Sequence, residues 1–526
     1  MKFLCKCCVP RPICFPHLPT PHSTLLQTMA TFNASVFGLK DSSLIKTQGL
    51  IDGKWVDAKD GSRFQVTNPA TLEELATVPD MGLEETKEAI DAAARAFPSW
   101  SATTPKHKQE LLNKLHNLMV EHHEDLSRLI TVENGKALSD AIGENRYSAS
   151  FLDWYAAEAL RTYGDHIPSV VPGLRNVVIK QPVGVVAILT PWNFPSAMIT
   201  RKLGAALAAG CTAVIKPAPE TPFSALALAE LCNRAGFPPG VVNIVTTQKN
   251  VAAVGKEMCE SKIVKKVTFT GSTNVAKLLY SMAASTLKKI SIEAGGNAPF
   301  IVFDDANIDE AVAAAIACKF RGGGQTCVCA NRLYVHSSVY DEFASKLAAQ
   351  VSAFKVGNGV ADGVTHGPLI HRRALEKVHS HVEDAVSRGA SVVIGGKPIA
   401  PEDPSSSFYH PTILTDVPTD ALVNTEETFG PLASLTKFET EEEVLHLANN
   451  VDVGLAGYLF SRDVGRVWRV AEKLEVGMVG SNVGMITQAA IPFGGIKESG
   501  IGREGGPRGI DEYMNEKLIV FGGIGA

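Results

Sequence analysis

The sequence predicts an α/β protein that is built on parallel sheets and divided into more than one domain. From residue 183 onward, short apolar segments of strand length alternate with longer helical segments. This alternation is typical of parallel sheets that are covered by helices. The chain has 526 residues, more than a single hydrophobic core usually holds, so two or three domains are expected.

The part of the chain before residue 183 is predicted to begin with short strands and to continue as helices. Asp52-Gly53 lies between two apolar runs and is a typical hairpin turn. From Leu83 onward apolar residues recur at helical spacing, and Asn134-Gly135 ends the third of these helices. Residues 165–182 are extended and apolar, and could form an arm that adds to another sheet.

Two α/β regions follow, and each has its own strands and helices. The first has predicted strands at 183–189, 211–215, 241–245 and 267–270 and helices at 199–209 and 224–235. The second begins after residue 327, with strands at 332–335 and 391–394, helices at 341–353 and 372–388, and a last strand at 516–520 that is expected to be exposed.

Composition excludes several classes of function. The formal charge of −5 and the absence of a Lys/Arg run argue against a nucleic-acid partner. No apolar stretch is long enough to span a membrane. The ten cysteines are scattered and form no disulfide framework, so a reducing compartment and a cytoplasmic location are expected.

The first 40 residues differ from the rest of the chain because they contain no Asp or Glu. Such a composition suits a mitochondrial transit peptide, but arginine is scarce and five prolines interrupt any amphipathic helix. Residues 1–40 are therefore expected to be a disordered extension, and a mitochondrial location is the alternative if they act as a transit peptide.

A cysteine at position 327 is the first candidate for chemistry. It follows Gly322-Gly323-Gly324-Gln325-Thr326, and three glycines in a row allow other groups to approach the main chain closely. A free cysteine is more often a buried core residue. A metal site using Cys327 and Cys329 would need further ligands, and no His or Cys lies close in sequence except Cys318. No metal is therefore expected.

Polar residues follow four predicted strands, those at 183–189, 211–215, 267–270 and a further one at 290–292, at the edge where parallel sheets bind ligands. They are Asn193, Lys216, Ser272 and Glu293. Taken singly, each has an ordinary reading as a turn, surface or capping residue. Together with Cys327 they predict a nicotinamide site for aldehyde oxidation. The thiolate would attack the carbonyl carbon, the Asn193 amide and the Cys327 N–H would hold the oxyanion, and Glu293 would activate water.

Four longer motifs resemble the NAD(P)-dependent aldehyde dehydrogenase superfamily from about residue 48 to the end. They are Ile292–Asn297, the block from Phe320 through Cys327 to Arg332, Glu427-Thr428-Phe429-Gly430-Pro431, and Pro492–Lys497. The resemblance implies Cys327 as nucleophile, Glu293 as general base and Asn193 as oxyanion donor. It also implies Lys216 and Glu427 at the ribose hydroxyls, with Trp192, Ser272 and Phe429 lining the cofactor groove.

The fold implied by this resemblance has a Rossmann-like cofactor domain, a catalytic α/β domain and a β-arm for assembly into a homo-oligomer, either a dimer or a tetramer. The expected boundaries are 41–164 and 183–298 for the NAD(P)-binding domain, 299–505 for the catalytic domain, and 165–182 and 506–526 for the arm.

Within the superfamily, three further segments resemble the branch that oxidises succinate semialdehyde in 4-aminobutyrate degradation. They are Pro195–Lys202, Gly324–Cys329 and Asp452–Tyr458. Arg201 and Arg321 could pair with the distal carboxylate of the substrate, although either could instead form an ion pair within the fold. Thr487 stands in the segment where this branch commonly has a carboxylate-binding serine. One alternative is oxidation of another small or ω-carboxy aldehyde, such as glutarate semialdehyde. Another is a phosphorylating dehydrogenase of the Cys-His type, but the chain has no histidine near the thiol block.

Two further expectations concern the cofactor and redox chemistry. Strictly NAD-dependent members tend to have an acid three residues after the cofactor lysine, where this chain has Pro219. We therefore expect NADP to be tolerated or preferred. In this branch the pair Cys327 and Cys329 resembles a redox switch, and a disulfide between them requires the loop to bend.

Overall fold

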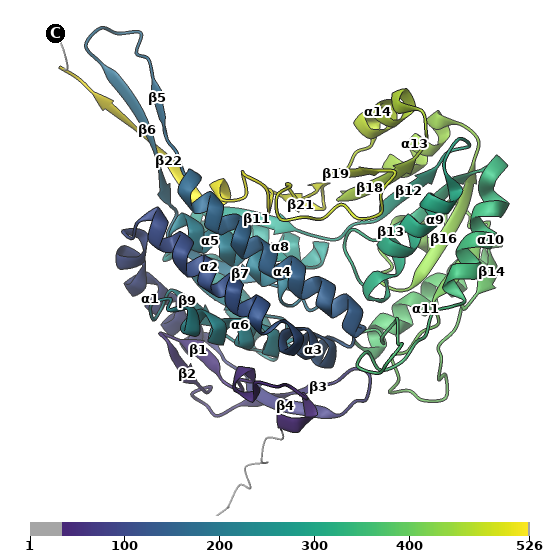
Figure 1. The fold of residues 1–526 in the computed structure, drawn as a ribbon, viewed down its shortest axis with the longest axis horizontal. Coiled ribbons are helices and arrows are strands. Elements are labelled where there is room, and N and C mark those ends of the chain that lie inside the picture. Colours follow the sequence, from purple (N-terminus) through teal and green to yellow (C-terminus); the bar gives the residue numbers. More distant parts are fainter. Residues whose placement is uncertain (1–33, 524–526) are drawn as a thin grey trace, which may run out of the picture. The chain divides into compact units, whose positions relative to one another are not determined.

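The computed structural model describes residues 34–523. They form two large sheets covered by helices, a three-stranded arm and two small two-stranded sheets (Figure 1), and the predicted α/β fold class is confirmed. The expected extension over residues 1–40, with its transit-peptide alternative, lies mostly outside the described residues. Its boundary was too late, because Phe37 is fully buried against Phe223 with ring centroids 5.0 Å apart.

The first large sheet has eight strands, and its five central strands are parallel. Antiparallel strands lie at both edges: two of them form the hairpin predicted at Asp52-Gly53, whereas the strand at the opposite edge was not expected. In spatial order the strands are β2 (Lys54–Val56), β1 (Gly49–Ile51), β9 (Val242–Ile244), β8 (Thr212–Lys216), β7 (Val185–Leu189), β10 (Val264–Thr270), β11 (Lys289–Glu293) and β21 (Gly500–Ile501).

Helices cover both faces of this sheet because its strands are apolar on both sides. On β7, Val186 and Ile188 face one core cluster while Ala187 and Leu189 face another. The first cluster contains residues of α2 (Pro105–Glu121), α3 (His123–Asn134), α4 (Leu138–Glu158), α5 (Ala197–Ala209) and α6 (Pro222–Ala235). The second contains residues of α1 (Leu83–Ser101), α7 (Val251–Glu260) and α8 (Thr273–Ala283).

The second large sheet has seven strands, all parallel except one edge strand. In order they are β14 (Ser391–Ile394), β15 (Thr412–Thr415), β16 (Leu432–Phe438), β13 (Ala330–His336), β12 (Ala298–Val302), β18 (Ala456–Phe460) and β19 (Met478–Ser481). Its helices are α9 (Ile308–Ala315), α10 (Tyr340–Val351), α11 (Arg372–Ser387), α12 (Leu422–Thr425), α13 (Glu441–Asn449) and α14 (Val464–Lys473). The division into domains at residues 298 and 505 stays a prediction.

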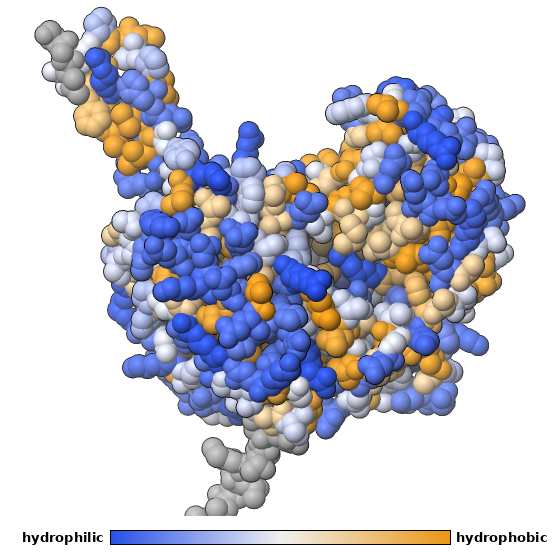
Figure 2. Space-filling view, viewed as in Figure 1, coloured by the Kyte–Doolittle hydropathy of each residue, from blue (hydrophilic) through white to orange (hydrophobic). Residues whose placement is uncertain are grey.

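The arm is an antiparallel sheet that joins distant parts of the chain. β6 (Arg175–Pro182) lies between β5 (Asp165–Ile167) and β22 (Met514–Phe521). It projects beyond the helices, and apolar residues gather on its surface (Figures 1 and 2). The small sheets pair β3 (Arg63–Thr67) with β4 (Glu74–Pro79), and β17 (Val453–Gly454) with β20 (Ile496–Lys497).

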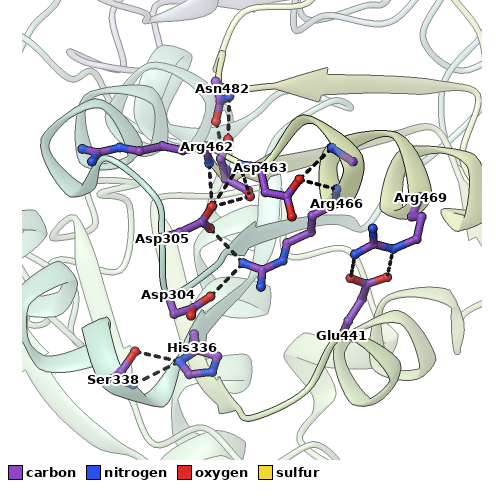
Figure 3. A network of polar contacts seen from close by, with 12 residues as sticks. Asp304, Asp305, His336, Ser338, Glu441, Arg462, Asp463, Arg466, Arg469 and Asn482 are labelled. Atoms are coloured by element: carbon purple, nitrogen blue, oxygen red, sulfur yellow. Dashed lines mark hydrogen bonds and ion pairs between the residues drawn. The ribbon is translucent and has the colours of Figure 1, made fainter.

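A network of charges attaches α14 to the residues that follow β12 in the seven-stranded sheet (Figure 3). Arg466 Nη1 contacts Asp304 at 2.7 Å and Asp305 at 2.9 Å. Asp305 also accepts hydrogen bonds from the backbone N–H groups of Arg462 and Asp463. Side chains that reach from the end of β12 therefore hold the loop before α14, beside the edge strand β19.

Candidate active site

The four predicted strand-end residues lie along one edge of the eight-stranded sheet. β8, β7, β10 and β11 are consecutive parallel neighbours, so their carboxyl ends meet. Lys216 and Glu293 are the last residues of β8 and β11, and Asn193 and Ser272 follow β7 and β10. The prediction that these residues share one edge is confirmed, although their roles are not settled by position alone.

The thiol loop is shaped by glycines in the left-handed conformation. Gly324 has φ +74°, and a Cβ there would lie 2.1 Å from the carbonyl oxygen of Gly430. Glycine is therefore required where this loop passes the segment that contains Glu427 and Phe429. The close backbone approach expected from the glycine run is present.

The thiol and the candidate base lie where the two large sheets meet. β12 and β13 begin directly after the two motif loops, and their first residues, Ala298 and Ala330, are paired neighbours. A Cβ at Gly296 would lie 2.5 Å from the carbonyl oxygen of Cys327. The glycine next to the Glu293 loop thus allows the two loops to touch.

The Asn193 side chain points to the thiol loop. It is buried, and its Nδ2 donates to the carbonyl oxygen of Gln325 at 3.0 Å. Gln325 lies two residues before Cys327, so the amide is held beside the nucleophile, where a donor to a developing oxyanion is needed.

The Glu293 carboxylate is almost completely buried, and neither of its oxygens has a hydrogen-bond partner within residues 34–523. A Cβ at Gly494 would lie 2.8 Å from Oε1, so this glycine leaves room for the carboxylate. Burial, with the negative charge of Glu504 as a second cause, holds the pKa of Glu293 well above its usual range. A raised pKa suits a group that takes up a proton.

The Cys327 thiol is half-buried, and burial raises its pKa to about 12 while the positive charge of Arg201 opposes the rise. Cys329 is buried and points to Lys319, whose Nζ lies 3.4 Å from its sulfur. Burial raises the pKa of Cys329 also. The Cys329 N–H donates to the Thr326 carbonyl at 3.0 Å, so the loop between the two thiols is already bent into a turn.

Two aromatic rings and a buried lysine mark the side of the site that suits a dinucleotide. The rings of Trp192 and Phe429 are perpendicular, with centroids 5.6 Å apart. Lys216 Nζ donates to the Pro217 carbonyl at 2.9 Å, and burial lowers the pKa of Lys216 to about 8. Ser272 is exposed at the start of α8, and its side chain does not cap the helix. These donors fit ribose and phosphate oxygens.

Glu427 comes from the opposite sheet and completes this group. Its Oε1 accepts from the Gly296 N–H at 3.2 Å, and burial raises its pKa to about 7. A Cβ at Gly295 would lie 2.9 Å from Glu427 Oε2. The carboxylate therefore lies against the loop that follows Glu293, where it can accept hydrogen bonds from ribose hydroxyls. The donors and acceptors present fit a nicotinamide dinucleotide.

The three predicted substrate residues differ in their surroundings. Arg201 is fully buried and forms an ion pair through Nε with Glu504, the internal pairing that the sequence left open. Its Nη1 has no hydrogen-bond partner among the described residues. Arg321 is half-buried over the Phe194 ring, 5.5 Å from the centroid, and makes no ion pair within residues 34–523. Thr487 is half-buried in the loop after β19.

Several site residues could not be found from motifs. Glu504 pairs with both Arg201 and Lys202, and accepts from Thr268 at 3.3 Å. Tyr147 lies beside Arg201, and the guanidinium is the polar neighbour of its buried hydroxyl. These side chains lie far from the thiol in sequence, and only the position of Lys202 next to Arg201 hinted at a role.

The described residues contain no group of three or more His, Cys, Asp or Glu side chains that could hold a metal ion. Within the same residues no helix is both long and apolar enough to cross a membrane.

Comparison with known proteins identifies the family. The chain is 54% identical over 486 residues to the glutarate-semialdehyde dehydrogenase of Pseudomonas aeruginosa, covering 92% of this chain and 100% of the relative. It is 54% identical over 484 residues to the NADP(+) succinate-semialdehyde dehydrogenase GabD of Escherichia coli, covering 92% and 99%. The crystal structure of succinate-semialdehyde dehydrogenase from Burkholderia pseudomallei matches with a TM-score of 0.90 at 51% identity, covering 92% and 99%. The family model described as "Aldehyde dehydrogenase family" matches residues 55–519. The resemblance seen in the motifs is confirmed, and the chain belongs to the aldehyde dehydrogenase family.

Proposed function

We propose that this protein oxidises succinate semialdehyde to succinate with NAD(P)+ as the oxidant. The observation that carries the proposal is a buried donor, Arg201 Nη1, that has no hydrogen-bond partner among the described residues and lies with the Tyr147 hydroxyl beside Cys327. Buried donors without partners are costly. A second carboxylate at the far end of a short aldehyde would accept hydrogen bonds from both.

Arg321 adds a third donor to this group. Its charge acts on Tyr147 together with that of Arg201, and its guanidinium lies over the Phe194 ring. The half-buried hydroxyl of Thr487 would complete the carboxylate site. A charge-assisted hydrogen bond contributes about 1.5–3 kcal/mol, so these groups would favour an ω-carboxylate strongly over a plain aliphatic chain.

The first chemical step needs the thiolate of Cys327. Glu293 is the candidate proton acceptor, since its high pKa matches a proton taken from a thiol. The thiolate sulfur bonds to the aldehyde carbon, and the carbonyl electrons move to oxygen. The Asn193 amide and the Cys327 N–H stabilise that oxyanion.

The second stage converts the thiohemiacetal to the acid. Lys216 and Glu427 would hold NAD(P)+, which would supply the acceptor for the hydride of this carbon. Loss of that hydride would leave a thioester on Cys327. Glu293 releases the thiol's proton to solvent and then takes a proton from water, which attacks the thioester carbon; this second proton later returns to the departing sulfur. The carbon–sulfur bond breaks, succinate leaves, and the thiol is restored.

A substrate and cofactor panel tests the proposal. Succinate semialdehyde should exceed propanal in kcat/KM, and Arg321→Ala should lower kcat/KM for succinate semialdehyde by about 10- to 100-fold. The same variant should leave propanal oxidation within a few-fold of the parent. If Arg321→Ala affects both substrates equally, the arginine does not bind a distal carboxylate.

Glutarate semialdehyde is the second candidate substrate, because a glutarate-semialdehyde dehydrogenase is 54% identical to this chain. It carries the same two functional groups and one more methylene. Pockets discriminate a single methylene only by about 10- to 200-fold. The ratio of the two kcat/KM values therefore decides between the substrates.

We also propose that NADP+ is accepted or preferred. Pro219 stands three residues after Lys216, so a carboxylate that would repel a 2′-phosphate is lacking at that position. Glu220, the next residue, is half-buried near Lys216, and its carboxylate would disfavour NADP+ only if it pointed toward the 2′-phosphate. A kcat/KM ratio strongly in favour of NAD+ would overturn this proposal.

Exposed apolar residues and an open sheet edge support a proposal for assembly, and the free cysteines support one for location. The arm exposes Ile167, Val170, Leu518 and Val520. β19 is the edge strand of the seven-stranded sheet, and within residues 34–523 no strand pairs with its outer side. We infer a homo-oligomer, a dimer or tetramer, in which the arm of one copy covers the edge of another. A cytoplasmic location is consistent with the six free cysteines of the described residues. Fractionation of cells that produce the full chain would distinguish a cytoplasmic from a mitochondrial location.

A further inference from the structure

The loop that carries the oxyanion donor is held at three points by one short stretch of the chain. Asn134 at the end of α3 donates from Nδ2 to the Trp192 carbonyl at 3.0 Å. Lys136 Nζ donates to the carbonyl of Asn193 itself at 2.6 Å. Glu144 Oε1 in α4 accepts from the Ser196 N–H at 3.0 Å. The stretch from Asn134, at the end of α3, to Glu144 in α4 therefore contacts both ends of the Asn193 loop.

Lys136 and Glu144 also bind each other. Lys136 Nζ lies 2.6 Å from Glu144 Oε2, and the two side chains are 3% and 0% exposed. The ammonium also lies over the Phe194 ring, 4.2 Å from the centroid. Taking two charges out of water is costly, and apolar residues of similar volume often stabilise a fold as well or better. A buried pair of this kind in contact with the Asn193 loop therefore indicates a role in positioning that loop.

The contacts of this pair fix the backbone from which the amide projects. The first helical N–H groups of α5 have no intrahelical partners, and the Ser196 side chain does not cap the helix. Glu144 takes that place by accepting from Ser196 and, at 3.4 Å, from Ala197. Lys136 holds the other peptide of the loop through the Asn193 carbonyl. Release of either contact would let the Asn193 side chain turn away from the thiol loop.

The same helix reaches the thiol loop. Asp140, in the first turn of α4, accepts from the Gly322 N–H at 2.8 Å. The start of α4 thus touches the oxyanion loop through Glu144 and the nucleophile loop through Asp140. The first turns of α4 therefore hold both loops that supply oxyanion donors, the Asn193 amide and the Cys327 N–H.

We propose that Lys136 and Glu144 are positioning residues that set the orientation of the Asn193 amide toward the oxyanion. The proposal rests on the oxyanion role of Asn193 in the proposed function, and neither residue is assigned a contact with substrate. A misplacement of about 1 Å in such a group can cost on the order of 100-fold in rate.

A double-mutant cycle tests the proposal. Lys136→Met should lower kcat by about 10- to 100-fold, with the dissociation constant for NADP+ within about twofold of the parent's. In an Asn193→Ala background the amide is already missing, so the same Lys136→Met change should lower kcat by less than about threefold. Glu144→Gln keeps an oxygen that can accept from Ser196, and should have a smaller effect than Lys136→Met.

Lys108→Met is the matched control. Lys108 is also a buried lysine that donates to a backbone carbonyl, that of Thr103 at 2.6 Å, and lies over an aromatic ring, Trp100. It should leave kcat within about twofold of the parent. If Lys136→Met unfolds the enzyme, Lys136→Met combined with Glu144→Leu removes both charges and takes its place in the cycle.

Two results would overturn the proposal. One is an equal loss of kcat from Lys136→Met with and without Asn193, since the pair would then act independently of the amide. The other is a folded Lys136→Met enzyme with parental kcat. The cycle uses whichever aldehyde the parent oxidises best. If the proposed substrate is wrong, the parent's selectivity shows it, and the effect of Lys136→Met on kcat can still be measured with and without Asn193.

Discussion

At the scale of single residues, the proposed chemistry depends on the sulfur of Cys327. Cys327→Ser should lower kcat by on the order of 10⁴-fold or more, because an alcohol is a far weaker nucleophile than a thiolate. The change is nearly isosteric, so the thermal unfolding midpoint and the NADP+ dissociation constant should stay close to the parent's. A serine variant with near-parental turnover would show that the sulfur is not the nucleophile.

Two protonation equilibria predict the pH dependence of the enzyme. Burial raises the pKa of Cys327 to about 12, and burial beside Glu504 raises that of Glu293. Both groups act in their deprotonated forms, and a raised pKa means that these forms are scarce at neutral pH and increase with pH. We expect kcat/KM to rise from pH 6.5 to 9, with a slope of up to about tenfold per unit. A profile that falls over this range would contradict the assignment.

The neighbouring thiol gives a redox prediction. The turn from Thr326 to Cys329 brings the two cysteines close along a bent loop, and we expect peroxide to join Cys327 to Cys329 by a disulfide with loss of two electrons and two protons. A thiol reductant should then restore the activity of the parent but not that of Cys329→Ala, whose Cys327 would oxidise further. Equal recovery of the parent and the variant would exclude the switch.

The sequence was most informative about residues that belong to continuous motifs. Cys327, Glu293, Asn193 and Glu427 could be named because each stands in a run of glycines, prolines or aromatic residues. The ion pair between Arg201 and Glu504 could not be predicted, because the two residues are 303 positions apart and meet only through packing. Lys136 was missed for the same reason, since a single lysine after a helix looks like a surface residue.

At the scale of elements, the thiol loop depends on one close approach. Gly324→Ala would add a Cβ 2.1 Å from the Gly430 carbonyl oxygen at a left-handed position. We expect a loss of about 2–4 kcal/mol in the free energy of unfolding, together with a lower kcat, because the loop must move away from Glu427. Urea unfolding and steady-state rates measure both effects.

Gly61→Ala is the control for this prediction. Gly61 has φ +72°, close to that of Gly324, but nothing lies within 4 Å of a Cβ built there. It should cost about 1 kcal/mol and leave kcat unchanged. If both alanine variants behave alike, the conformation of Gly324 matters and its contact with Gly430 does not.

Elements were predictable where one chain segment was enough to define them. Alternating apolar and helical runs located β7, β8, α5 and α6 to within a few residues. The antiparallel strand β21 was not expected, because its two residues, Gly500 and Ile501, carry no strand pattern and pair with β11 from a distant part of the chain. The order of strands in a sheet is likewise a property of contacts between segments.

At the scale of the whole molecule, the arm predicts assembly. Residues on β22 such as Leu518 and Val520 are half or more exposed. The edge strand β19 contacts α14, on which Val464 and Trp468 are exposed as well. Two copies related by a twofold axis could cover both surfaces at once, since each copy offers one arm and one edge.

Val520→Asp tests this arrangement, and Val120→Asp in the last turn of α2 is its control. The two valines are 50% and 52% exposed, so the substitutions are matched in chemistry and in accessibility. A carboxylate in a buried apolar interface has no partner and costs several kcal/mol, whereas on a solvated helix it costs little. We expect Val520→Asp to shift the sedimentation coefficient toward that of a smaller species and Val120→Asp to leave it unchanged. Parental sedimentation of both variants, or a monomeric parent, would mean that the arm is not an assembly surface.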